Sequence, residues 1–178
     1  MMRHDQFQQS LASLTSMYSS CAHVRQSSEG KHPHWKAVLM QGPLEQLREL
    51  QAEMHGYLKL PHPLPDLPLP GDSDPVSSPV NVDEFHLAVE NLRRLYTAAG
   101  SLRVELGQYR PRLYATLVRQ LVPSLSAIQQ SLAVYLKWDE VEKTLAELEV
   151  RQNGADGTDS SGPSLGPVEQ QERTAGHP

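Results

Sequence analysis

The sequence predicts an all-α protein, and three observations lead to this prediction. Aromatic residues make up 6% of the chain, with two Phe and two Trp, so a core would consist mainly of Leu, Val and Ala. Such a composition suits helices better than sheets, in which β-branched and aromatic residues are enriched. Apolar residues recur at steps of three and four over long stretches, which is the spacing of one helix face. We therefore expect a four-helix bundle, or two helix hairpins, with coiled-coil-like seams.

Changes in composition divide the chain into four parts. Residues 1–60 are expected to form an N-terminal helical pair, and residues 81–150 a long helical hairpin. Residues 61–80 contain seven prolines and predict a semi-rigid, proline-rich linker. Residues 151–178 are rich in Gly, Pro and Ser and contain no aromatic residue, so they predict a disordered C-terminal tail.

The first helix is expected over residues 5–26, with Asp5 as its N-cap. Its core face repeats with steps of four and three, close to a heptad pattern. The residues on that face are Phe7, Leu11, Leu14, Tyr18 and Cys21.

Residues 27–41 are expected to be a connecting loop, because they contain Gly30 and Pro33. Pro43 suits the first position of a helix, so the second helix is expected to begin at residues 42–43 and to end before Pro61. In this interpretation Trp35 and its apolar neighbours cover the end of the core. The core face of the second helix is Leu44, Leu47, Leu50, Met54 and Leu58.

The third helix begins with a capping signal, Asn81 followed three residues later by Glu84. A heptad seam then runs from Phe85 to Leu106, widened by Val89 and Tyr96. Gly107 is a typical helix stop and Pro111 a typical helix start, which predicts a hairpin turn between them. A kinked continuous helix is the alternative, because Leu106, Tyr109 and Leu113 stay nearly in phase.

One long helix is expected over residues 111–150. Its seam continues in phase across Pro123, which predicts a bend there rather than a break. Beyond Tyr135 the apolar residues shift to a new phase, comparable to a stutter in a coiled coil. The residues in the new phase are Trp138, Val141, Leu145 and Leu148.

The charge of the chain changes sign where this phase shift occurs. Residues 81–137 carry seven basic and four acidic residues, whereas residues 138–150 carry five acidic residues and one lysine. Acidic side chains at the C-terminal end of a helix oppose its macrodipole. One explanation is that they keep an exposed helix end soluble. The other is a partner-binding surface, with acids around the apolar anchors Trp138, Val141, Leu145 and Leu148.

Helix lengths favour the partner-binding explanation. A helix over residues 111–150 would span roughly 60 Å, against roughly 39 Å for residues 81–106. If these two helices pair, the last third of the longer one has no cover from its partner. The first or second helix could supply that cover.

A second candidate surface surrounds the expected hairpin turn. Four arginines, with two tyrosines between them, predict a patch that binds phosphates, nucleic acid or acidic partners. The competing interpretation is a solvated turn. The residues are Arg103, Arg110, Arg112, Arg119, Tyr109 and Tyr114.

No motif for catalysis, cofactor binding or metal binding is present: the chain has no phosphate loop, dinucleotide fingerprint, metal-binding helix or nucleophile elbow. His32 and His34 lack a third ligand nearby, and Cys21 lacks a close cation that would activate it. The net charge of −5 also argues against a dedicated nucleic-acid binder.

The expected function is therefore a non-enzymatic helical scaffold or adaptor subunit that packs against partner helices and needs no cofactor. A small helical enzyme without a recognisable motif is an alternative. The chain shows no apolar leader or membrane-spanning stretch, so we expect it in the cytoplasm or nucleus. Within the linker, Ser78–Pro79 is a candidate phosphorylation site, and residues 65–68 match the bare PxxP pattern.

Overall fold

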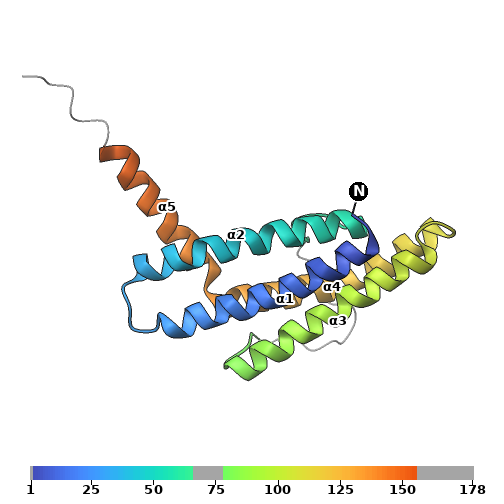
Figure 1. Ribbon diagram of the computed structural model, residues 1–178, viewed down its shortest axis with the longest axis horizontal. Coiled ribbons are helices and arrows are strands. Elements are labelled where there is room, and N and C mark those ends of the chain that lie inside the picture. Colours follow the sequence, from blue (N-terminus) through green and yellow to red (C-terminus); the bar gives the residue numbers. More distant parts are fainter. Residues whose placement is uncertain (1, 66–77, 156–178) are drawn as a thin grey trace, which may run out of the picture.

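The computed structural model describes residues 2–65 and 78–155, and these residues form helices and connecting segments without a strand (Figure 1). The predicted all-α class is confirmed. The predicted tail beyond residue 155 and the linker residues 66–77 lie outside the described residues. The five helices are α1 (His4–Ser27), α2 (Pro33–Leu58), α3 (Val82–Leu106), α4 (Pro111–Leu136) and α5 (Trp138–Ala155).

Helices α1 to α4 lie side by side and enclose one hydrophobic core (Figure 1). α1 packs on α2 and α3, and α3 packs on α4. Aromatic rings connect the two helical pairs, because Phe85 of α3 contacts both Tyr18 of α1 and Tyr135 of α4, at centroid distances of 6.3 and 4.6 Å. The bundle is therefore held together across the pairs as well as within them.

Helix α1 follows the sequence pattern closely. All five residues predicted for its core face, from Phe7 to Cys21, are buried. The predicted cap was wrong, because Arg3 is the N-cap and Asp5 lies in the first turn. Arg3 N–H donates to the side chain of Gln6, 2.8 Å away, which supplies half of a capping box.

Helix α2 begins about ten residues before its predicted start. Residues 33–41, expected in a loop, are helical: His32 is the N-cap and Pro33 the first helical residue. Pro43 therefore lies inside the helix rather than at its start. The helix tolerates this proline because its fixed φ is helical, and the carbonyl that loses its partner belongs to the exposed Leu39.

The hairpin between α3 and α4 agrees with the prediction. The Asn81 side chain accepts from Glu84 N–H at 2.9 Å, as expected of a capping residue. α3 ends at Leu106 and α4 begins at Pro111, so the chain turns between them. α4 then continues through Pro123 without a break, as its unbroken phase predicted.

The single long helix predicted for residues 111–150 was wrong. α4 ends at Leu136, and Lys137 adopts a left-handed conformation with φ of 55° before α5 begins. The phase shift after Tyr135 is therefore a change of helix direction and not a coiled-coil stutter. The new direction buries Val141 against the rest of the protein. α5 also extends to Ala155, beyond the predicted end at Val150.

Gly100 lets α1 and α3 approach closely, which gives a first testable prediction. A Cβ built on Gly100 would lie 2.6 Å from Cε1 of Phe7, whose ring is fully buried and stacked on Tyr57. Gly100→Ala is expected to lower the free energy of unfolding by about 1–2 kcal/mol, because overpacking outweighs the gain in helix propensity. Urea denaturation measures this change.

Gly56 of α2 provides the matched control for this substitution. A Cβ at Gly56 has no neighbour within 4 Å. Gly56→Ala is expected to raise the free energy of unfolding by about 0.5–1 kcal/mol through helix propensity alone. Equal effects of the two substitutions would show that Gly100 is not needed for the contact with Phe7.

Candidate functional sites

The first turns of α5 dock on α2 of the same chain. Val141 is 3% exposed, and Trp138 packs partly against the core. Arg48 of α2 lies over the Trp138 ring, 5.3 Å from its centroid, and forms a salt bridge with Glu142. The helix lengths left this segment without a partner in α3, and α2 packs against it instead.

The last turns of α5 leave the bundle, as Figure 1 shows. Leu145 still packs partly against the core, Leu148 is half-buried, and Val150 is 72% exposed. Of the four residues predicted to contact a partner, Val141 is instead buried in the protein's own core. The area on α5 that stays open is consequently smaller than expected and lies toward its C-terminal end.

A second apolar surface lies on the first turns of α2. Trp35, Val38 and Leu39 are 54%, 52% and 37% exposed, and their spacing of three and four residues places them on one side of the helix. We call these three residues the α2 patch. This surface was not predicted from the sequence, because its residues were expected to form a loop that covers the core.

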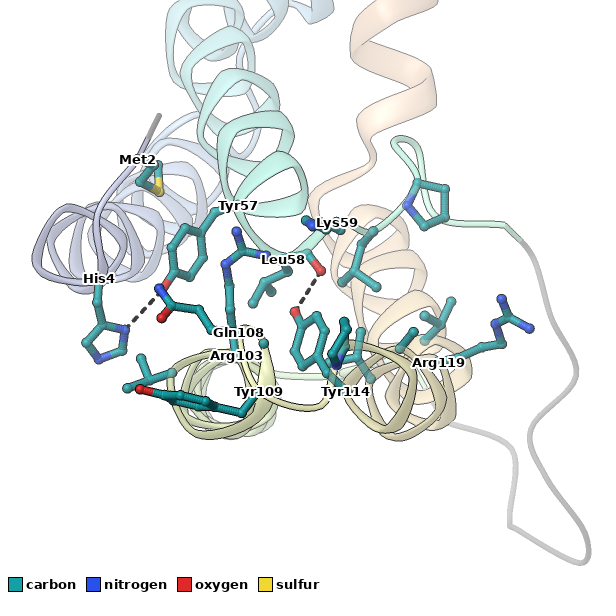
Figure 2. A pocket seen from close by; sticks show the side chains of 18 of the residues that line it. Met2, His4, Tyr57, Leu58, Lys59, Arg103, Gln108, Tyr109, Tyr114 and Arg119 are labelled. Atoms are coloured by element: carbon teal, nitrogen blue, oxygen red, sulfur yellow. Dashed lines mark hydrogen bonds between the residues drawn. The ribbon is translucent and has the colours of Figure 1, made fainter.

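A cleft of about 1180 Å³ opens at the end of the bundle where α2 ends and α3 turns into α4 (Figure 2). Four segments meet there: the N-terminal residues, the end of α2 with residues 59–65, the α3–α4 turn and the first half of α4. We call this the end cleft. Apolar side chains from α2 and α4, namely Leu58, Ala115, Val118 and Val122, contribute to its lining.

Arg103 lies in the middle of the end cleft, between Tyr57 and Tyr114 (Figure 2). Its guanidinium is 4.6 Å from the centroid of the Tyr57 ring, and its side chain is half-buried. Tyr114 donates a hydrogen bond to the carbonyl of Leu58 at 2.7 Å. Burial raises the pKa of Tyr114, and the nearby Arg103 partly opposes that rise.

The predicted arginine patch is only partly brought together. Arg103 and Arg119 both line the end cleft, as do Tyr109 and Tyr114, whereas Arg110 and Arg112 do not. The chain adds Lys59 from the end of α2, which sequence spacing could not reveal. Lys59 follows the helix in a left-handed conformation with φ of 55°, which places it at the cleft.

A buried polar network crosses the core from α2 to α4. Gln129 Nε2 donates to the Tyr96 hydroxyl at 2.7 Å, so the Tyr96 O–H is left to donate to His55 Nε2, 2.6 Å away. His55 Nδ1 lies 3.0 Å from Nδ1 of His62 and, in this assignment, carries the proton. Burial is the main cause that lowers the pKa of His55 to about 4, so His55 is neutral at pH 7.

Among the described residues, Cys21, His32 and His34 lack the surroundings of a reactive site. Cys21 is buried, and burial raises its pKa to about 12, which disfavours the nucleophilic thiolate. His32 and His34 lie with their ring centroids 4.6 Å apart. Within residues 2–65 and 78–155, no group of three or more His, Cys, Asp or Glu side chains is arranged to hold a metal ion.

Comparison with family models, with curated proteins and with solved structures gives no match to this chain. Of the helices in the described part of the chain, none combines the length and the apolar character needed to cross a membrane.

Proposed function

We propose that this protein is a non-enzymatic helical interaction subunit that acts as a scaffold or adaptor by packing against partner helices. The observation that carries the proposal is the α2 patch: three large apolar side chains stand in solvent on one side of a well-formed helix. The last turns of α5, with Leu148 and Val150, are proposed as a second contact area.

The α2 patch has the make-up of a binding hot spot. Tryptophan is enriched among residues that dominate binding energy, because it buries a large area with little loss of side-chain freedom. Gly42 lies three residues beyond Leu39 and so extends the same side of the helix, and a Cβ there would meet open space. A partner side chain can therefore approach the backbone beside the patch.

The interior of the bundle supports a binding role more than an enzymatic one. Among the described residues, each buried side-chain nitrogen or oxygen has a hydrogen-bond partner. His55 and Tyr96 are held by their neighbours in the core, and Cys21 is protonated. These polar groups are therefore explained by packing and by hydrogen bonding within the protein.

Affinity purification of the tagged full chain tests the proposal. Trp35→Ala/Val38→Ala is expected to weaken capture of the partner by about thirtyfold or more, which corresponds to 2 kcal/mol for a hot-spot residue. Partner proteins are quantified by mass spectrometry, and affinity is measured on the purified pair.

The control variant Leu87→Ala/Val134→Ala removes two exposed apolar side chains from α3 and α4, outside the α2 patch. It is expected to leave capture unchanged. If the wild-type chain is monomeric and captures nothing, the proposal is wrong. Equal losses in the two variants would show that capture depends on general surface hydrophobicity.

A further inference from the structure

We propose that the end cleft binds an acidic peptide segment, containing both carboxylate and apolar side chains, of a partner protein. This inference rests on the proposed interaction function and names the chemistry of one partner segment. It does not involve the α2 patch, which lies on the first turns of α2, whereas the cleft lies at the last turn of that helix.

The charge of the end cleft differs from that of the whole chain. The protein has a net charge of −5, yet Lys59, Arg103 and Arg119 line the cleft, and no Asp or Glu within residues 2–65 and 78–155 does. Figure 2 shows these three cations at separate places along it. A ligand that satisfies them must carry several negative charges spaced along its length.

Arg103 provides the strongest single argument. It is half-buried, and among the described residues no carboxylate lies within salt-bridge distance of it. Partly buried cations are normally paired, because removal from water is unfavourable without a counter-charge. Arg103 has instead the face of Tyr57. A carboxylate from a ligand would supply the missing counter-charge, with the two-pronged geometry that guanidinium groups favour.

Two acidic side chains of the described residues, Asp5 and Glu53, do not remove this need. Asp5 is paired with Arg3 at 3.6 Å, so the charge of Arg3 is partly neutralised. Glu53 lines a neighbouring cavity of about 760 Å³, which Arg103 also borders, but it does not line the end cleft. The positive charge of the end cleft therefore belongs to Lys59, Arg103 and Arg119.

The size and lining of the cleft favour a peptide over other anions. Its volume of about 1180 Å³ exceeds the roughly 300–1,000 Å³ typical of pockets for drug-sized molecules. The apolar side chains of Leu58, Val118 and Val122 can contact apolar side chains of a peptide, such as Leu. A free phosphate has no apolar group that could make these contacts. Nucleic acid is disfavoured, because the net charge of −5 opposes the binding of a long polyanion.

Fluorescence anisotropy with the full chain tests the proposal. The probe is a short labelled peptide in which Glu and Leu alternate, and the comparison peptide has Gln in place of Glu. The wild-type protein is expected to bind the acidic peptide at least about tenfold more tightly, with affinity falling as salt is raised. Arg103→Gln/Arg119→Gln is expected to lose about tenfold in affinity for the acidic peptide.

Two further variants keep the result interpretable. Arg93→Gln/Arg94→Gln changes the net charge equally but alters residues paired with Glu90 outside the cleft, so binding is expected to stay within about twofold. Lys59→Gln/Arg119→Gln alters only exposed side chains. If the Arg103 variant loses helicity by circular dichroism, this second variant tests the role of the cleft charges in its place. It is expected to weaken binding by about threefold or more.

Equal affinity for the acidic and amide peptides would overturn the proposal. So would an equal loss in Arg93→Gln/Arg94→Gln, an unchanged affinity in Lys59→Gln/Arg119→Gln, or equally tight binding of a single-stranded oligonucleotide of the same charge. Absence of binding of the acidic peptide would also overturn the cleft proposal, and it would leave the partner capture through the α2 patch unaffected. Peptide binding without any captured partner would contradict the proposed function and not the cleft.

Discussion

Phe85→Ala is expected to lower the free energy of unfolding by about 3–5 kcal/mol, as large-to-small changes at fully buried aromatic residues do. Phe85 is fully buried, and its ring lies between Tyr18 of α1 and Tyr135 of α4. The substitution therefore leaves a cavity where three helices meet. Urea denaturation followed by circular dichroism measures the loss.

Leu87 serves as the matched control on the same helix. It is exposed, so Leu87→Ala is expected to change the free energy of unfolding by less than about 0.5 kcal/mol. Hydrogen exchange adds a second reading, because a shared core requires that Phe85→Ala speed exchange in α1 as well as in α3 and α4. Unchanged exchange in α1 would show that the helical pairs are independent units.

Acidification from pH 7 to pH 4 is expected to remove about 3 kcal/mol of stability through His55, about 2 kcal/mol of it by pH 5. The pKa of His55 falls from 6.5 to about 4 because burial disfavours its charged form, with a smaller contribution from His62. Between these values the unfolded chain binds a proton and the folded protein does not. Stability therefore decreases as pH falls through 6.5, and the decrease levels off below pH 4.

The variant His55→Gln tests whether His55 causes the loss of stability in acid. Its amide oxygen can still accept from the Tyr96 hydroxyl, but the side chain no longer titrates. Denaturation curves at pH 7 and pH 5 should then lie closer together than those of the wild type. Glu90 does not interfere with the comparison of pH 7 and pH 5, because hydrogen bonds from Arg93 lower its pKa from 4.5 to about 2, and its contribution is lost only as pH falls through that lower range. An unchanged pH dependence in His55→Gln would rule out His55 as the source.

Regular spacing explains why much of the fold was predictable. The core face of α1 repeats without a competing signal, and each residue predicted for it is buried. The start of α3 was equally clear, because Asn81 and Glu84 together satisfy the helix terminus. In both cases the local sequence and the packed structure favour the same conformation.

The start of α2 was missed because a local signal outweighed a longer pattern. Gly42–Pro43 resembles a helix start, yet Ala37 and Met40 extend the steps of three and four upstream of it, and both are buried. The break at Lys137 had no signal of this kind, because a lysine rarely adopts positive φ. The turn there buries Val141 and lets α5 pack on α2, and both depend on the folded bundle.

The candidate surfaces were harder to predict than the helices. The end cleft joins residues from four segments, and Lys59 meets Arg103 only after the bundle forms. The α2 patch could be predicted only if Trp35 was placed in a helix, and the sequence placed it in a loop. Conversely, Val141 seemed available to a partner because the sequence left open whether the first or second helix covers it, and the structure shows that α5 packs on α2.

Site-specific photo-crosslinking in cells that express the full chain tests directly whether the α2 patch binds a partner. A photoreactive residue at position 42 places the reactive group beside the α2 patch and leaves Trp35 in place, and one at position 94 places it on an exposed polar part of α3. We expect a covalent adduct with a partner protein from position 42 and none from position 94. Absence of an adduct at position 42, or equal adducts from both positions, would contradict the proposed function.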